Sequence, residues 1–325
     1  MTAPTPTELT YPDIEAAAAR IAGRVRPVTV APAGEDGLFF ALEFMQHTGT
    51  FKARGAQNFI QAHLAEGTFP EAGVTIASGG NAGLACAWAA RVAKVPATVF
   101  LPTTAPSVKV EWLRSYGARV ELVGSEFAEA AAACQEFVES SGALASHAYD
   151  HPLIAAGAGT LMTEILAQVP DLDTVVVSVG GGGLFAGIAT AATHHGVRTV
   201  AVEPENCRAL NAAIEADEPV DVTVDSVAAD SLGARRATPL ALEAARSDLV
   251  TSVLVSDNAI VEARQRLWDE HRLAVEHAAA TALAGVSGHD GESVSDGRTV
   301  CGYVPAEGEK VCVVLCGANM SLGDL

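Results

Sequence analysis

Short runs of β-branched residues alternate with longer alanine-rich runs along most of the chain. Strands are expected at VTIAS (74–78), ATVFLP (97–102), RVELVG (119–124) and ALASH (143–147), and later at TVVVSVG (174–180), RTVAVEPE (198–205) and KVCVVLCG (310–317). Helical patterns follow most of these runs. Strands that alternate with helices form parallel sheets covered on both faces, so the pattern predicts an α/β fold. The alternation is irregular before residue 70 and between 205 and 256.

Composition limits the class of protein. The chain has 325 residues, of which 49% are hydrophobic, and a formal net charge of −19. It is long enough for one large or two ordinary domains, and its acidity argues against a nucleic-acid partner. No stretch reads as a signal peptide or a membrane span, so a soluble cytoplasmic protein is expected. The six cysteines include no CxxC pair, which argues against a zinc ribbon or a disulfide framework.

A run of four glycines follows the apolar run that begins at residue 174. Gly180, Gly181, Gly182 and Gly183 let main-chain amides converge at the start of a helix, where the helix dipole also favours an anion. The run therefore predicts a phosphate site. Its spacing also satisfies the GxGxxA dinucleotide pattern, with Glu203 at the end of the next strand, so a nicotinamide-dependent dehydrogenase is an alternative.

A lysine stands at another junction between a strand-like run and a helix. Lys52 lies between Phe51 and Ala53, and Thr48 or Thr50 is expected to cap the coming helix. An ammonium among apolar groups is partly desolvated, which lowers its pKa and makes the amine able to form an imine. Combined with a phosphate site, this lysine predicts a phosphorylated aldehyde as ligand.

A third turn joins the strand at 74–78 to an alanine-rich helix. It carries Ser78, Gly79, Gly80 and Asn81, whose main-chain amides and hydroxyl suit a carboxylate. The amide of Asn81 offers both a donor and an acceptor to a phenolic oxygen.

Four motifs in this order give the chain a family resemblance. TGTFKARGA (48–56), ASGGNAG (77–83), GGGGLFAG (180–187) and VVLCGAN (313–319) resemble fold type II pyridoxal-phosphate enzymes of the serine/threonine dehydratase (ammonia-lyase) group. VAADSLGARRATPLAL (227–242) is similar to a segment of bacterial threonine/serine dehydratases. The resemblance covers residues 20–321. It implies a two-domain fold like the tryptophan synthase β chain, with a large cofactor-binding domain (1–70 and 150–325) and a small substrate-closing domain (71–149).

The resemblance also implies roles for particular residues. Lys52 would hold pyridoxal 5'-phosphate as an imine, with Phe51 beside the ring. The cofactor phosphate would lie on the amides of Gly180, Gly181, Gly182, Gly183 and Leu184. Asn81 would touch the 3′-oxygen, Cys316 would face the pyridine nitrogen, and Glu276 would lie near the ring. The substrate carboxylate would be bound by Ser78, Gly79, Gly80 and Asn81.

The implied activity is elimination of water from a small 3-hydroxy amino acid such as L-threonine or L-serine, after which the released enamine hydrolyses to a 2-oxo acid and ammonia. A thiol at Cys316 cannot keep the pyridine nitrogen protonated, which favours elimination over transamination. A serine racemase and a β-replacement synthase are alternatives with the same cofactor. A racemase needs a second acid/base opposite Lys52, and the sequence identifies none. Ala209 departs from relatives that bind divalent ions, so a monovalent cation near Glu203 is expected instead, and a homodimer is expected from the family.

Overall fold

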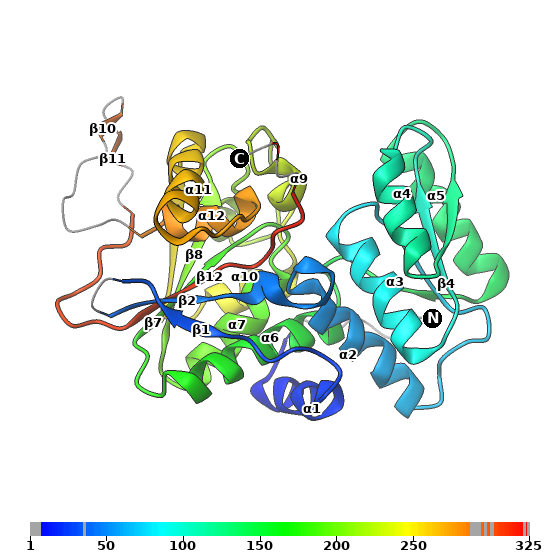
Figure 1. Cartoon of the computed structure of the whole chain (residues 1–325), viewed down its shortest axis with the longest axis horizontal. Coiled ribbons are helices and arrows are strands. Elements are labelled where there is room, and N and C mark those ends of the chain that lie inside the picture. Colours follow the sequence, from blue (N-terminus) through cyan, green and yellow to red (C-terminus); the bar gives the residue numbers. More distant parts are fainter. Residues whose placement is uncertain are drawn as a thin grey trace.

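Two sheets with helices on both sides make up the fold. The computed structural model describes residues 8–34, 37–286, 294–295, 298–299, 302–320 and 323. Apart from the β1–β2 pair at one edge and a short β10–β11 ribbon, every neighbouring pair of strands is parallel. The predicted α/β fold with mostly parallel, open sheets is therefore confirmed (Figure 1).

The larger sheet has six strands in the order β1-β2-β12-β7-β8-β9. Their bounds are β1 (Val30–Pro32), β2 (Leu38–Ala41), β12 (Val311–Val314), β7 (Thr174–Ser178), β8 (Arg198–Pro204) and β9 (Val250–Val255). Strand β12 pairs with both β2 and β7, so the last strand of the chain lies beside the segment that leads to Lys52. The sequence analysis missed β9, because this edge strand is only partly buried and its Thr251 and Ser252 interrupt the apolar run.

Helices cover both faces of the larger sheet. They are α1 (Tyr11–Ile21), α6 (Pro152–Gln168) and α7 (Gly183–His194) on one side, and α11 (Asp257–His271) and α12 (His277–Ala284) on the other (Figure 1). Strands β7, β8 and β12 are almost entirely buried, as expected of a parallel sheet with two covered faces. One continuous apolar core joins the sheet to these helices.

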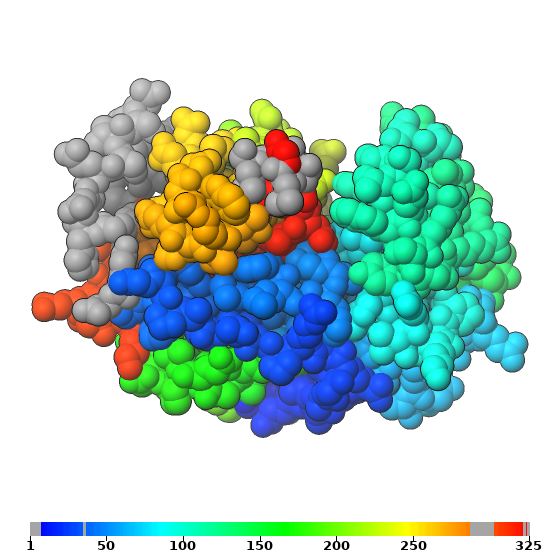
Figure 2. All heavy atoms as spheres, in the orientation of Figure 1, coloured from blue at the N-terminus to red at the C-terminus, as the bar shows by residue number. Residues whose placement is uncertain are grey.

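The smaller sheet has four parallel strands in the order β5-β4-β3-β6. Its elements are β3 (Val74–Ala77), α3 (Asn81–Ala93), β4 (Ala97–Leu101), α4 (Ser107–Ser115), β5 (Arg119–Leu122), α5 (Phe127–Ser141) and β6 (Leu144–Ala145). Figure 2 shows a notch between the surface of these helices and the rest of the molecule. Helix α2 (Lys52–Ala65) packs Ala53 and Phe59 into the core of this smaller sheet, although it precedes residue 71. The division into domains at residues 70 and 150 stays a prediction.

Helix α2 crosses α6 at unusually close range. A Cβ on Gly157 would lie 2.8 Å from the Cα of Gly55 and 2.7 Å from the carbonyl oxygen of Arg54. A side chain at either glycine would push the two helices apart. These two glycines therefore determine how closely α2 packs on α6, and with it the position of Lys52 relative to the larger sheet.

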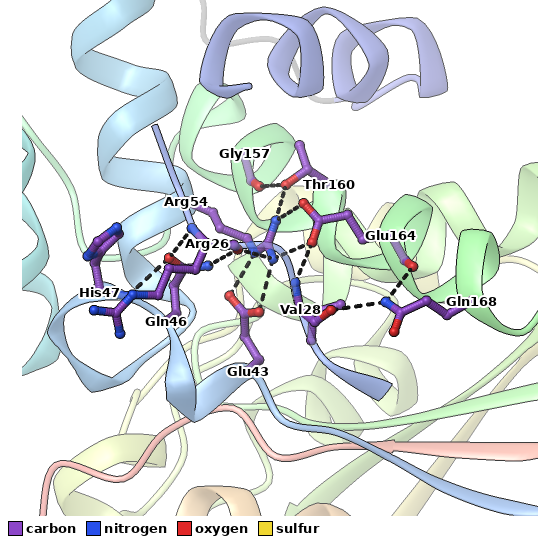
Figure 3. Close-up of polar contacts among 10 residues, drawn as sticks. All are labelled: Arg26, Val28, Glu43, Gln46, His47, Arg54, Gly157, Thr160, Glu164 and Gln168. Carbon is purple, nitrogen blue, oxygen red and sulfur yellow. Dashed lines mark hydrogen bonds and ion pairs between the residues drawn. The ribbon is translucent and has the colours of Figure 1, made fainter. Parts of the chain in front are cut away.

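A buried ion network fixes the same helix from another side. The guanidinium of Arg54 is fully buried and makes paired hydrogen bonds to Glu43, at 2.7 and 3.0 Å, and to Glu164, at 2.7 and 2.8 Å (Figure 3). Glu43 belongs to the short helix η1 (Glu43–Met45), and Glu164 lies on α6. Paired bonds of this kind restrict both distance and orientation. The network thus ties the segment before Lys52 to α2 and α6.

Several short elements complete the described chain. They are η2 (His47–Gly49), α8 (Ala209–Ala216), α9 (Ala229–Leu232), α10 (Pro239–Ala245), β10 (Val294–Ser295) and β11 (Arg298–Thr299). Five cysteines are free and buried, while Cys301 lies outside the described residues. Among the helices that the structure describes, none has the length and apolar character to cross a membrane.

Candidate active site

Lys52 is the first residue of α2, at the junction predicted from the sequence. Its Nζ donates a hydrogen bond to the carbonyl oxygen of Ala148 at 3.1 Å and lies 4.8 Å from the centre of the Phe51 ring. Within the described residues the amine forms no ion pair. Burial lowers the pKa of Lys52 to about 8, although the nearby Cys316 and Glu276 oppose the shift. The expected desolvated amine is therefore present, with a useful neutral fraction near pH 7 to 8.

The expected threonine cap of α2 was wrong. The residue that precedes the helix is Phe51, and it makes no side-chain capping bond. Thr48 instead adopts a left-handed conformation with φ of 62°, and the buried hydroxyls of Thr48 and Thr50 have no hydrogen-bond partner among the described residues. What holds this junction is main-chain pairing, since Phe51 donates its amide to the carbonyl oxygen of Cys316 at 3.0 Å.

The glycine run connects β7 to α7 at the carboxyl end of the sheet. Gly182 has φ of +97°, and a Cβ on Gly181 would lie 2.3 Å from the ring of Tyr149, so both positions require glycine. In the described part of the chain, the main-chain amides from Gly180 to Leu184 donate no hydrogen bond. A helix N-terminus with unused amides is suited to a phosphate.

Lys52 and this glycine loop line one pocket. Its wall includes Phe51, Lys52, Gly183 and Leu184, together with the segment from Ser146 to Tyr149. An electrophile held by the lysine and an anion held by the loop would therefore share one cavity. These residues fit a phosphorylated aldehyde, because the desolvated amine supplies the nucleophile and the unused amides supply the anion site.

Asn81 is the first residue of α3, at the end of the Ser78–Gly80 turn. Its Nδ2 donates to both carboxylate oxygens of Glu276 at 3.1 Å, and its Oδ1 accepts from Asn319 at 2.8 Å. The smaller sheet, the N-terminus of α12 and the C-terminal segment therefore meet at this amide. The sequence placed Asn81 and Glu276 separately, and the structure brings them into direct contact.

Glu276 and Cys316, two further predicted residues, lie beside Lys52, and both have raised pKa values. Burial raises the pKa of Glu276 to about 7, against the opposing hydrogen bond from Asn81 and the charge of Lys52. Burial also raises the pKa of the Cys316 thiol to about 12, with Ser178 Oγ at 3.7 Å from its sulfur. Cys316 is therefore a neutral thiol at physiological pH.

The carboxylate of Glu203 is bound by main-chain amides of the protein. Its two carboxylate oxygens accept the main-chain amides of Leu210 and Asn211 at 2.8 and 2.7 Å, at the start of α8. Burial nevertheless raises the pKa of Glu203 to about 8. No group of three or more metal-ligating side chains occurs in the described ranges. A monovalent cation near Glu203 stays a prediction.

Sequence reasoning missed three residues around the pocket. His147 and Tyr149 line it directly, and Asn319 holds Asn81 and the carbonyl oxygen of Thr48. A signal for His147 did exist, because it ends the run 143–147 that was expected to be a strand. Polar residues just after parallel strands gather at the carboxyl edge of a sheet, where ligands bind.

Comparisons with known proteins show the family to which the chain belongs. Residues 25–317 match the family model described as pyridoxal-phosphate dependent enzyme. The chain is 38% identical over 266 residues to an L-threonine ammonia-lyase of Geobacter sulfurreducens, covering 81% of this chain and 65% of that protein. It is 35% identical over 289 residues to a serine dehydratase-like protein of Mus musculus, covering 87% and 85%. The chain thus spans about two thirds of the length of the bacterial relative.

The solved structures show the same fold. The structure of maize serine racemase superposes with a TM-score of 0.84 at 30% identity, covering 97% of this chain and 95% of that one. The family model includes both the Lys52 junction and the glycine loop. The chain belongs to the family of pyridoxal-phosphate-dependent enzymes, with the type II fold and pyridoxal 5'-phosphate as its cofactor.

Proposed function

We propose that the protein eliminates water from a small 3-hydroxy amino acid, such as L-threonine or L-serine, and that the unsaturated amine so formed takes up water again to give a 2-oxo acid and ammonia. The observation that carries the proposal is the single pocket that contains both the desolvated amine of Lys52 and the unused amides of the glycine loop. Relatives named as threonine ammonia-lyases and serine dehydratase-like proteins support the substrate class.

Each part of the pocket has a proposed task. Bound pyridoxal phosphate supplies the electron-withdrawing ring that stabilises charge at the substrate Cα. The Gly180–Leu184 amides hold its phosphate, and the Ser78–Asn81 turn holds the substrate carboxylate. Lys52 Nζ, neutral in part because burial lowers its pKa to about 8, takes the Cα proton.

The neutral thiol of Cys316 bears on which reaction follows. Its raised pKa, about 12, leaves no anion in that position to hold a proton on a ring nitrogen. A weaker electron sink shortens the lifetime of charge at Cα and favours prompt loss of the β-hydroxyl. This supports elimination over transamination.

The direct test uses the purified holoprotein. Wild type is expected to absorb in the visible and to release ammonia from a 3-hydroxy amino acid, and Lys52→Ala is expected to lose both signals. Lys94→Asn is the matched control, because Lys94 is exposed at the end of α3 and asparagine tolerates its φ of 58°. Colour without ammonia release across a panel of 3-hydroxy amino acids would refute the elimination, and colourless protein that binds NADH would favour the dehydrogenase alternative.

Racemisation is a second candidate, favoured by the similarity to maize serine racemase. Ser78 offers a hydroxyl in the turn before α3, whereas Asn81 is held by Glu276 and Asn319. A racemase would form D-serine from L-serine, and Ser78→Ala would then lower D-serine formation more than ammonia release. A β-replacement synthase would consume an added thiol nucleophile instead of releasing ammonia. The expected homodimer remains a proposal that sedimentation analysis can test.

A further inference from the structure

His147 lies in the pocket of Lys52 without a task in the reaction as proposed so far. It follows β6, at the carboxyl end of the smaller sheet, and lines the pocket between Ser146 and Ala148. Its side chain is exposed, which fits a ring that faces an open cavity. Lys52 donates to the carbonyl oxygen of the next residue, Ala148, so the two side chains are anchored at adjacent points of one wall.

Hydrogen bonds to one edge of the ring fix its tautomer. His147 Nδ1 accepts the main-chain amide of Asp150 at 2.8 Å and that of Tyr149 at 3.3 Å. A nitrogen that accepts N–H groups must carry a lone pair, so the proton of the neutral ring is on Nε2. The Tyr149 ring packs edge-on at 5.0 Å and restrains the imidazole further. Nε2 donates no hydrogen bond among the residues that the structure describes.

The pocket environment favours the neutral form of the ring. Desolvation by the surrounding protein is the main cause that lowers the pKa of His147; the carboxylate of Asp150 raises it, and the charge of Lys52 lowers it further. Tyr149 and His151 are further titratable neighbours, and His151 also interacts with it electrostatically. A second proton would have to enter at Nδ1, where it would face two N–H donors. His147 is therefore a hydrogen-bond donor and a poor source of protons.

We propose that His147 is a specificity residue whose Nε2–H donates a hydrogen bond to the oxygen on the substrate β-carbon. This inference rests on the proposed function, because it assumes an amino acid bound next to Lys52. A neutral N–H donor recognises a hydroxyl or a carboxylate oxygen. It offers nothing to a substrate that carries hydrogen or halogen at the same carbon, and it opposes an ammonium group there.

Two substitutions test the two nitrogens of His147 separately: the donor Nε2, and Nδ1, which accepts the amides of Tyr149 and Asp150. In His147→Asn, the side-chain oxygen takes the place of Nδ1 and accepts the amides of Tyr149 and Asp150, but no donor reaches the place of Nε2. In His147→Gln, a donor reaches that place while the acceptor for the loop is lost. His195→Asn, at the exposed end of α7, is the matched control.

The assay compares two leaving groups on one carbon skeleton. With L-serine or L-threonine, whichever wild type uses better, His147→Asn is expected to lower kcat/KM about 10- to 100-fold, and His147→Gln less. With β-chloro-L-alanine the same variants stay within about 2-fold of wild type, because chloride is a poor acceptor and leaves without a proton. Equal losses on both substrates, or none on either, would overturn the assignment.

The tautomer can be tested without turnover. Long-range proton–nitrogen spectra of the holoenzyme, with His147 identified by its absence from His147→Asn, are expected to show protonated Nε2 and unprotonated Nδ1 at pH 7. A cationic ring, or a proton on Nδ1, would overturn the inference while leaving the proposed function intact. Wild type that processes β-chloro-L-alanine but no hydroxy amino acid would refute the proposed function itself, and the assignment of His147 with it.

Discussion

Lys52 and Arg54 stand two residues apart on α2 and have opposite electrostatic surroundings. Burial lowers the pKa of Lys52 to about 8, and no carboxylate pairs with it within the described chain. Burial would lower the pKa of Arg54 as well, but Glu43 and Glu164 reverse the effect and raise it above the ordinary value. On the same helix, Lys52 can therefore lose its proton near neutral pH, whereas Arg54 stays protonated.

The difference arises because the side chains of Lys52 and Arg54 face different partners in the fold. Arg54 points to η1 and α6, where two carboxylates accept four hydrogen bonds from its guanidinium and the Thr160 hydroxyl accepts another (Figure 3). Lys52 points to the pocket, where its only hydrogen-bond acceptor among the described residues is a main-chain carbonyl. Without a paired carboxylate, the amine of Lys52 can lose its proton and act as a nucleophile. The two carboxylates that pair with Arg54 instead hold α2 in place.

The largest effect is expected from Lys52→Met. Methionine has a similar length but no amine, so activity should fall at least about 10⁴-fold in the ammonia assay. Urea unfolding of the apoprotein should show no loss of stability, because the substitution removes a desolvated charge. A clear loss would mean that Lys52 supports the fold as Arg54 does.

The pH dependence of that stability difference follows from linkage. The folded-state pKa of Lys52, about 8, lies below its ordinary 10.5, so the charged amine costs stability below pH 8. The cost disappears as the pH rises from 8 to 10.5, since the unfolded chain then binds more protons than the folded one. The advantage of Lys52→Met over wild type should therefore shrink across this interval.

Arg54→Met comes next. It leaves Glu43 and Glu164 without their partner, and a broken buried network of this kind costs about 3–5 kcal/mol of unfolding free energy. Denaturant titration measures the loss. Arg246→Met is the matched control, because its ion pairs with Asp217 and Glu243 are half exposed and should contribute less than about 1 kcal/mol.

Arg54→Lys sharpens the comparison by keeping the charge. Lysine cannot form the two pairs of bonds at once, so a loss of about 2–3 kcal/mol is expected. This exceeds the roughly 1–2 kcal/mol expected for Glu164→Gln, because the Glu164 side chain is 31% exposed. If Arg54→Lys were as stable as wild type, the positive charge alone, without the paired hydrogen bonds of the guanidinium, would be enough to hold α2.

The smallest effect concerns the rate at which apoprotein takes up pyridoxal phosphate. Only the neutral amine attacks an aldehyde, and with a pKa of about 8 the rate should rise roughly tenfold from pH 7 and level off near pH 9. Visible absorbance follows the uptake. A rate that still climbs tenfold per unit above pH 9 would show that the amine behaves like an ordinary lysine.

Much of the frame was readable from the sequence because its signals are local. Alternating apolar runs predicted β3, β4, β7, β8 and β12, and the glycines after β7 predicted unused amides at the start of α7. The missed strand β9 and the wrong threonine cap have one cause. An edge strand and a helix start that is paired to a distant strand depend on partners that lie far away in the chain.

The sequence by itself determined which chemical groups stand at the ends of strands: an amine, an oligoglycine turn and a polar turn. Only the tertiary structure decided what each group faces. In the part of the chain that the structure describes, no carboxylate forms an ion pair with Lys52, whereas Arg54 pairs with Glu43 and with Glu164 of α6, which crosses α2 at Gly157. A local pattern records spacing along one element, whereas desolvation and pairing depend on what other elements bring within a few ångströms.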